Sequence, residues 1–486
     1  MLRKVLGLII VSTLFSPPAF AENLLEVYQL ALQNDPTFRA AQASLRIGLE
    51  NEKLGLAEIL PKVNVNLGFN FTRRENMGQF PAGGLLIPNN TKTNSTTRSW
   101  GISLDQPVFD LEAWFLFQRG QELTQQAKAQ FASDQQSLII RVVEAYVEVL
   151  RSRANLDASR AQEKATQRQL ELARERFKVG LAAITDVREA EAANDLAIAN
   201  RLGDEGELRV ALEKLSVLTG HQHHDLWVLK QDFPVAKPDP IDSEEWVRFA
   251  LTNNLDIKAA GFLRDAAHQA ARAAGARHLP KITTSLNYGQ NHSEVEQNNT
   301  KVDINQAFEI DNTQGSVAVN LNIPLFAGGG ISAGRRQAYA EYDRSSEQYL
   351  GTVRTTEQAT RALVISVLTN VAQVKAGQRA VISSRASLEA TEAGYQVGTR
   401  NIIDVLTAVR AVYSATRDYA NARLDYVLSK LRLKRFAGTL SPADVTDLNQ
   451  WLQPPAQKQQ TDLALPSGLS SPSPDNGQKK PQQRIQ

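Results

Sequence analysis

The chain has 486 residues, of which 42% are apolar, so it is long enough for two or three domains with packed cores. Its formal charge of +2 is nearly balanced, which excludes the strongly basic surface of a nucleic-acid-binding protein, and we expect no nucleic-acid partner. It contains no cysteine, which excludes disulfides, thiolate metal sites and a lipid-modified cysteine. Stability must therefore come from packing and from association of chains.

The first 21 residues have the three parts of a secretory signal peptide. Basic residues at positions 3 and 4 precede an apolar run at 5–15, and Ala-Phe-Ala at 19–21 supplies the small residues of a cleavage site. The alternative is a membrane anchor, but the run is well short of the roughly 20 residues that a spanning helix needs. We expect cleavage after Ala21 and a mature, exported chain that begins at Glu22.

Most of the remaining chain is an internal duplication, because short motifs recur in the same order about 218 residues later. We expect a first repeat at 22–220, a connector at 221–242, a second repeat at 243–438 and a further segment at 439–453. The tail at 454–486 is rich in Pro, Ser, Gln and Gly, a composition typical of disorder. The matching positions are Ala31, Leu32, Asn34, Leu60, Pro61, Lys62, Pro107, Phe109, Val179, Gly180, Asp186 and Val187, which correspond to Ala250, Leu251, Asn253, Leu279, Pro280, Lys281, Pro324, Phe326, Val397, Gly398, Asp404 and Val405.

After an opening helix, each repeat is predicted to contain a β-hairpin, at 62–106 and at 281–324. Apolar residues alternate with small or polar ones near both ends of each hairpin, which predicts four strands of about ten residues with one apolar face each. Such strands face lipid on one side and water on the other; the alternative is a soluble sheet that covers a core. The polar segments between paired strands, 73–97 and 290–312, are predicted to be external loops.

Prolines stand at the four predicted junctions between strand and helix, where a missing N–H is tolerated and the chain changes direction. Beyond the second and fourth junctions come long proline-free stretches, which predict helical hairpins at 110–219 and 328–437. Only Gly120 interrupts 110–179, so a helix of about 70 residues would reach roughly 100 Å. It needs an apolar seam that is covered along its length. The four junction prolines are Pro61, Pro107, Pro280 and Pro324.

Four strands cannot close a barrel, and an open sheet edge in lipid leaves backbone groups unpaired at several kcal/mol each. The barrel must therefore be shared between chains. Two chains would give eight strands, which leave no channel once side chains fill the interior, whereas three chains give twelve. The polar inner faces of the strands favour three chains.

Each long hairpin turns at a similar motif. Phe-Lys-Val-Gly precedes Asp-Val in 177–187, and Gly-Tyr-Gln-Val-Gly-Thr-Arg precedes Asp-Val in 394–405. Gly180 and Gly398 are predicted to end one helix in a left-handed cap, and Thr185, Asp186 or Asn401 to help start the next. Taken alone, these motifs indicate turns.

Together with the proline-bounded strand pairs and the signal peptide, however, these motifs resemble the TolC family of outer-membrane channel-tunnels over residues 22–452. The resemblance implies an α+β membrane protein: a homotrimer with a twelve-stranded β-barrel in the outer membrane and a long α-helical barrel of coiled-coil hairpins in the periplasm. A belt around the middle would come from 221–242 and 439–453. Such a duct serves drug efflux and type I protein secretion, with a periplasmic adaptor and an inner-membrane pump or ABC transporter as partners.

The resemblance also implies roles for residues at the helical tips. Thr185, Asp186, Tyr395 and Arg400 would hold the periplasmic entrance closed by tying the second hairpin to the first. Asp404 matches the acidic ring of the constriction and shares a predicted helix face with Arg400 and Thr407. The family's pattern has a second aspartate where this chain has Thr407, so weaker cation selectivity is expected. The tip turns, which would dock the adaptor, are Val179, Gly180, Val397 and Gly398.

Other candidate sites are weaker. The glycines at 328–330 follow a strand and open a helix, as a phosphate loop does, but the rest of that motif is missing, so we expect a flexible hinge. His221, His223 and His224 lack the spacing of a metal site, so we expect solvated loop histidines. No catalytic constellation stands out, and we expect no enzyme, cofactor or bound metal. The competing functions are a trimeric stalk or adhesin without transport, and a soluble exported helical enzyme.

Overall fold

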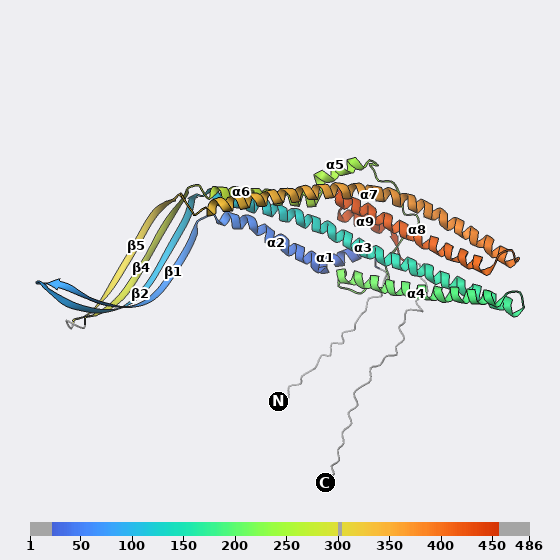
Figure 1. Ribbon diagram of the computed structural model, residues 1–486, viewed down its shortest axis with the longest axis horizontal. Helices are drawn as coiled ribbons and strands as arrows, with labels where there is room; N and C mark the ends of the chain where they lie inside the picture. Colours follow the sequence, from blue (N-terminus) through green and yellow to red (C-terminus); the bar gives the residue numbers. More distant parts are fainter. Residues whose placement is uncertain (1–21, 300–303, 456–486) are drawn as a thin grey trace, which may run out of the picture.

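The computed structural model describes residues 22–299 and 304–455. Figure 1 shows an elongated molecule with four long strands at one end and helical hairpins that run to the other. The predicted signal peptide at 1–21 and nearly all of the predicted tail lie outside the described residues. Among the helices described, none combines the length and the apolar character that crossing a membrane requires.

The second half of the chain repeats the order of the first: two short helices, two strands and two long helices (Figure 1). The connector contributes a short strand that pairs with the C-terminal strand. The first half comprises α1 (Leu24–Asn34), α2 (Pro36–Ala57), β1 (Lys62–Ala82), β2 (Leu85–Phe109), α3 (Leu111–Lys178) and α4 (Ile184–Thr219). The second comprises α5 (Ser243–Asn253), α6 (Leu255–Ala276), β4 (Lys281–Asn299), β5 (Ile304–Asn322), α7 (Gly330–Gln396) and α8 (Ile402–Phe436). The paired short elements are β3 (Val228–Leu229) and β6 (Leu452–Gln453), and α9 (Pro442–Gln450) precedes β6.

The predicted long helices are confirmed, since α3 has 68 residues and α7 has 67. The Asp110 carboxylate caps α3 by accepting from the Ala113 N–H at 3.0 Å. At the other end Gly180 has a φ of 76°, a left-handed conformation that glycine adopts without steric cost. The sequence therefore fixes both ends of α3 through local chemistry.

The strands are about twice as long as predicted. The prediction of irregular loops is wrong at 73–97, apart from the turn at 83–84, and at 290–299 and 304–312, all of which are strand; residues 300–303 of the second predicted loop lie outside the described residues. β1 and β2 pair without interruption from Lys62 and Asp105 to Ala82 and Leu85. In their distal halves the apolar residues no longer alternate along one face, since Met77 of β1 and Leu85 and Leu86 of β2 stand exposed near the turn among mostly polar residues. The period-two pattern therefore disappears, but backbone pairing does not depend on that pattern. The turn is the pair Gly83-Gly84, both with positive φ, which is a hairpin signal that the alternation analysis missed.

Pro107 is not at a junction, because β2 continues to Phe109; the ladder between β2 and β4 shifts its register between Pro107 and Phe109. Pro61 and Pro280 do immediately precede β1 and β4, and Pro324 lies between β5 and α7. The missing N–H of proline is accommodated at an irregularity of the ladder as well as at strand ends.

The largest apolar core lies at the middle of the helical part, in the predicted belt. It joins residues 138–150 of α3 to α1, α4, α8 and α9, with Leu138, Val142 and Val143 fully buried. The adjoining connector buries His223, which is only 4% exposed, so the expectation of a solvated histidine is wrong at this position. His221 and His224 are exposed as expected.

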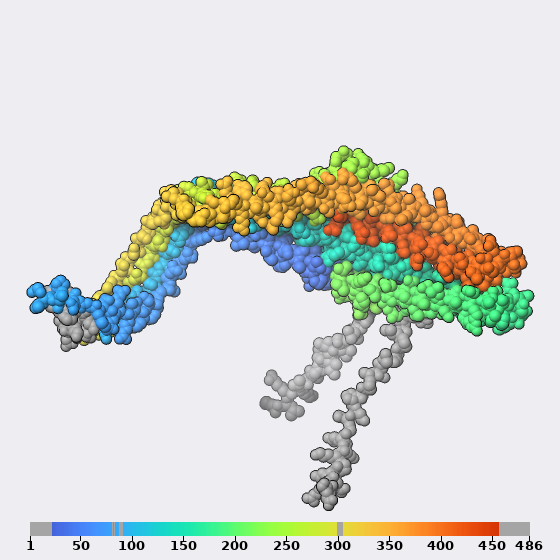
Figure 2. Space-filling model, in the orientation of Figure 1, coloured from blue at the N-terminus to red at the C-terminus, as the bar shows by residue number. Residues whose placement is uncertain are grey.

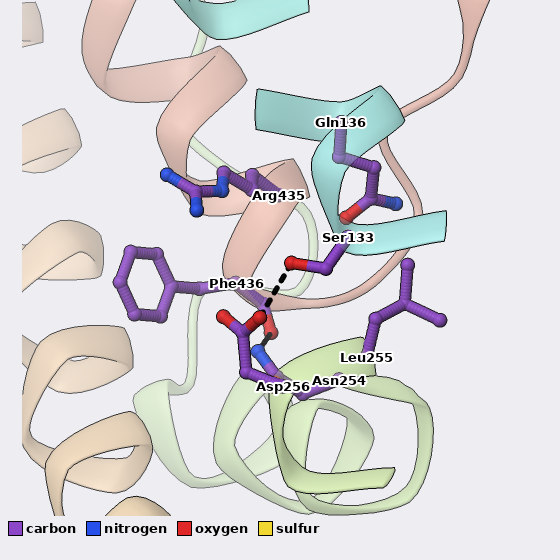
Figure 3. A pocket seen from close by; sticks show the side chains of 7 residues that line it. All are labelled: Ser133, Gln136, Asn254, Leu255, Asp256, Arg435 and Phe436. Carbon is purple, nitrogen blue, oxygen red and sulfur yellow. Dashed lines mark hydrogen bonds between the residues drawn. The ribbon is translucent and has the colours of Figure 1, made fainter. Parts of the chain in front are cut away.

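A buried cap joins the two short helices at the start of each half. Asp35 caps α2 and pairs with Arg141 of α3 at 2.6 Å, while Asn254 caps α6 and donates to the Phe436 carbonyl at 2.9 Å. Figure 3 shows Asn254 beside Ser133 of α3, whose hydroxyl donates to Asp256 at 2.5 Å. This joint fastens α6 to α3 and to the end of α8.

Gly120, the one interruption predicted in the first long helix, marks a close approach of α2 and α3. A Cβ at this position would lie 2.5 Å from the Asn51 carbonyl oxygen of α2, so only glycine lets the two backbones touch. We expect Gly120→Ala to cost about 1–3 kcal/mol of unfolding free energy through overpacking. The measurement is the midpoint of thermal unfolding in detergent.

Gly351 of α7 is the matched control, because a Cβ there would meet nothing within 4 Å. Gly351→Ala should leave stability unchanged or raise it by up to about 1 kcal/mol through helix propensity. Equal midpoints for the two variants would contradict the packing explanation.

Candidate functional site

The far ends of the two helical hairpins are built alike. Gly180 follows α3 and Gly398 follows α7, both with positive φ, and the chain then enters α4 or α8 within four residues. Asn401 caps α8 by accepting from the Asp404 N–H at 2.9 Å, as predicted. α4 differs: its cap residue, Ala183, offers no side-chain bond, so Thr185 and Asp186 lie inside the first turn and do not cap it.

Apolar side chains are exposed at these turns. Val179 is 68% exposed and Val397 76%, and Leu181 beside the first turn is 71% exposed. In both turns an exposed valine ends the incoming helix and is followed directly by a glycine in the left-handed conformation. Their role in docking an adaptor remains a prediction.

Arg400 does not share a helix face with Asp404 and Thr407, because α8 begins only at Ile402. The Asn401 cap explains the difference, since it keeps Arg400 outside the helix. Arg400 still reaches Asp404, with its Nη1 3.7 Å from the carboxylate oxygen. The pair is largely exposed and contributes at most about 1 kcal/mol. Thr407 is exposed one turn further along α8.

Tyr395 is nearly buried, and its main partner is Arg176 of α3, which the sequence analysis did not identify. The Arg176 guanidinium lies 4.6 Å from the centre of the Tyr395 ring, and its Nη1 donates to the Tyr395 carbonyl at 3.2 Å. Burial raises the pKa of the Tyr395 hydroxyl, the Arg176 charge opposes the rise and the Asp186 charge adds to it. Within the described part of the chain that hydroxyl has no hydrogen-bond partner.

A second contact between the hairpins lies about two turns closer to the belt, where the Gln169 amide of α3 donates to the Glu392 carboxylate of α7 at 3.0 Å. Arg176 and Gln169 therefore tie the first hairpin to the second within one chain. The Arg176 signal in the sequence was the cationic residue just before Phe-Lys-Val-Gly, but its partner lies 219 residues away. No local pattern could identify that partner.

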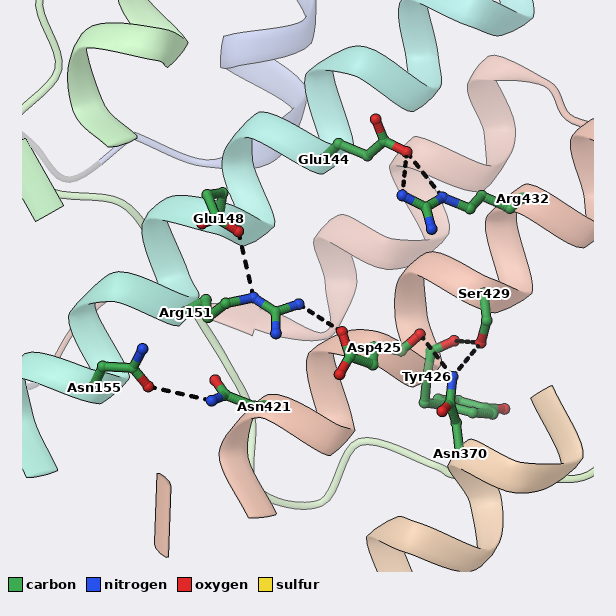
Figure 4. Close-up of polar contacts among 10 residues, drawn as sticks. All are labelled: Glu144, Glu148, Arg151, Asn155, Asn370, Asn421, Asp425, Tyr426, Ser429 and Arg432. Carbon is green, nitrogen blue, oxygen red and sulfur yellow. Dashed lines mark hydrogen bonds and ion pairs between the residues drawn. The ribbon is translucent and has the colours of Figure 1, made fainter. Parts of the chain in front are cut away.

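Toward the belt, α3 and α8 are joined by a ladder of polar contacts, which Figure 4 shows. Arg432 donates twice to Glu144, Arg151 pairs with Asp425 at 2.5 Å, and the Asn421 amide donates to Asn155 at 3.3 Å. Each step toward the tip on α3 is matched by an equal step on α8, as antiparallel helices require.

From Asn155 toward the tip the two hairpins separate and leave a groove of about 630 Å³. Its walls are mostly polar and come from three helices. They are Asn155, Ala158, Ser159 and Gln162 of α3, Leu196, Ala199, Asn200, Gly203, Asp204 and Glu207 of α4, and Arg410, Tyr413, Ser414 and Arg417 of α8. The hairpins are thus in contact at the belt and at the tip and apart between them.

Comparison with known proteins places this geometry in a family. The outer membrane efflux protein family matches residues 27–221 and 246–439, so each half of the chain matches separately. Outer membrane protein TolC of Vibrio cholerae is 34% identical over 93% of this chain and 99% of its own length. Alkaline protease secretion protein AprF of Pseudomonas aeruginosa is 30% identical over 88% of this chain and 86% of its own.

The fold agrees with a solved structure. The outer membrane protein VceC from Vibrio cholerae superposes with a TM-score of 0.69 at 20% identity, over 85% of this chain and 96% of VceC. The family match covers most of the chain, and the relatives align along nearly their whole lengths. This chain therefore belongs to the outer membrane efflux protein family.

Proposed function

We infer that the protein is an outer-membrane exit duct for efflux and type I secretion, which conducts small molecules or unfolded proteins passively from the periplasm to the exterior. The family is one of efflux channels, and one relative is named for secretion of a protease. One observation carries this inference: a single chain combines long helical hairpins with a four-stranded sheet that has one apolar, lipid-compatible face. We further propose that the protein catalyses no reaction.

The exposed face of the sheet supports a place in lipid. Val65, Leu67 and Phe69 alternate along β1 and are 65%, 82% and 71% exposed, which would be unfavourable for a soluble sheet. A stalk or adhesin without transport, the alternative function, has no use for such strands. The outer membrane is therefore the environment of the sheet, and the helices extend from it into the periplasm.

The two edges of the sheet support association of chains. The strand order is β1-β2-β4-β5, so among residues 22–299 and 304–455 β1 and β5 each have one edge without a partner. Since unpaired backbone groups cost several kcal/mol each in lipid, β1 of one chain would pair with β5 of the next. We propose a homotrimer whose twelve strands close a barrel around a water-filled channel.

The partners follow from the position of the tips. Exposed Val179 and Val397 beside Gly180 and Gly398 form an apolar surface at the end of the periplasmic helices. We propose that a periplasmic adaptor docks there and links the duct to an inner-membrane pump or an ABC transporter. Thr185, Asp186, Tyr395 and Arg400 would keep the entrance closed, and Asp404 with Thr407 would line its constriction.

Oligomeric state tests the proposed barrel directly. Native mass spectrometry of the protein extracted from outer membranes in mild detergent should give a mass of three chains, because twelve strands remove every sheet edge. A population of monomers or dimers under those conditions would defeat the closure argument.

The Arg176 contact generates a prediction for the entrance. Arg176→Gln removes the cation over the Tyr395 ring, worth about 0.5–2 kcal/mol, so the second hairpin should move outward more easily. We expect a higher single-channel conductance in planar bilayers, and the double variant Arg400→Ser with Tyr395→Phe, at two residues of the proposed gate, should raise it as well. Arg188→Gln is the control, because Arg188 pairs with Glu191 on its own helix. If neither Arg176→Gln nor the double variant changes the conductance, the constriction lies elsewhere in the duct.

Asp404 generates a separate prediction on selectivity. Three copies around a symmetric entrance would place like charges close together, which favours cations over anions. Asp404→Ala should weaken cation selectivity and block by multivalent cations in the same recordings, whereas Thr407→Ala should change neither. Selectivity that survives Asp404→Ala would show that another group supplies the field.

A further inference from the structure

Glu22, the first residue after the predicted cleavage site, is bound to the belt by its backbone. Its N–H donates to the Asp225 carbonyl at 2.9 Å, and its carbonyl accepts from the Trp227 N–H at 3.0 Å. The two contacts form a parallel bridge centred on Leu226, which is 1% exposed. The chain is therefore held in place from its first mature residue.

The Glu22 side chain is bound as well. Its carboxylate contacts Nδ1 of His223, and Nε2 of the same ring lies 2.6 Å from the Thr219 hydroxyl. The His223 side chain is 0% exposed and both of its ring nitrogens have a partner, while the Glu22 side chain is 32% exposed. The Tyr146 hydroxyl donates to the Trp227 carbonyl at 2.8 Å and closes the site from α3.

The charges around this N–H are mostly negative. The carboxylates of Glu22, Glu26 and Asp225 lie on the segments that meet here; Arg153 pairs with Asp225 at 2.8 Å, and the Glu22 carboxylate contacts the His223 ring. A further positive charge at the backbone nitrogen of Glu22 would balance the group.

We propose that residues 219–227 are a docking site for the α-ammonium group that signal-peptide cleavage creates at Glu22. Hydrolysis of the bond between Ala21 and Glu22 adds one water, leaves a carboxylate on Ala21 and gives Glu22 an ammonium group. The new group keeps its donation to the Asp225 carbonyl and adds two donors and a charge beside the carboxylates. Processing thereby completes the belt. This proposal rests on the predicted cleavage and is independent of transport.

The test uses the mature protein purified from outer membranes. Its N-terminal sequence should begin at Glu22, and reductive methylation should modify its α-amine at least about tenfold more slowly than in the urea-unfolded chain, as a charge-assisted contact requires. His223→Leu should raise the methylation rate toward the unfolded value. His224→Leu, the same change at the exposed neighbouring histidine, should not.

A second variant moves the charge without changing the site. Insertion of Gly-Ser between Ala21 and Glu22 places the ammonium group two residues away, so its methylation rate should equal that of the unfolded chain. A mature N-terminus at another residue, or an α-amine as reactive in the native protein as in urea, would overturn the proposal. If His223→Leu does not reach the membrane, the proposal is still tested by two measurements: the ratio of methylation rates of the unmodified protein in its native state and in urea, and the methylation rate of the insertion variant.

Discussion

The packing of α3 is the constraint on which the rest of the molecule depends. An isolated helix of 68 residues has no core of its own, and its stability must come from neighbours along its length. α3 is in contact with α2 and α6 near the strands, with α4 toward the tip and with α8 at the belt. The sheet and the entrance lie at opposite ends of this single helix, so the covering of α3 determines how both are held (Figure 2).

The covering changes in character along the helix. At the belt it is apolar and fully buried, around Leu138 and Val143. From Glu144 to Asn155 ion pairs and amide contacts to α8 flank that apolar core, and beyond Asn155 a groove separates the hairpins. Polar contacts near the surface add little net stability, whereas a buried apolar core adds much. Apolar burial therefore holds the belt, and a smaller apolar cluster around Ile402 and Val405 of α8, with Ala165 of α3 packed against it, lies nearer the tip.

The sequence predicted the elements whose signals are local. Proline-free stretches gave the long helices, and glycine after Val179 and Val397 gave the tip turns, because a left-handed cap is a property of a few adjacent residues. Alternation predicted only the half of each strand next to the helices, since apolar residues such as Met77 and Leu85 in the distal half do not alternate regularly with polar ones. Pairing there depends on the partner strand, not on residue pattern.

The candidate site was predicted only in part for the same reason. Tyr395, Arg400 and Asp404 lie at the tip as the motif implied, but Arg176 and the burial of His223 depend on contacts between segments some 200 residues apart in sequence. The Asn401 cap also moved Arg400 off the helix, which spacing by itself does not reveal.

The length of the strands bears on where cargo leaves the protein. β1 has 21 residues, which at about 3.3 Å each measure roughly 70 Å, whereas about 9–11 residues cross the hydrocarbon layer. Each of the four strands thus has roughly twice the residues that the hydrocarbon layer needs. With the excess on the outer side, substances that pass through the duct would be released into water away from the bilayer, and an apolar compound would have to diffuse back over that distance before it could partition into the membrane again.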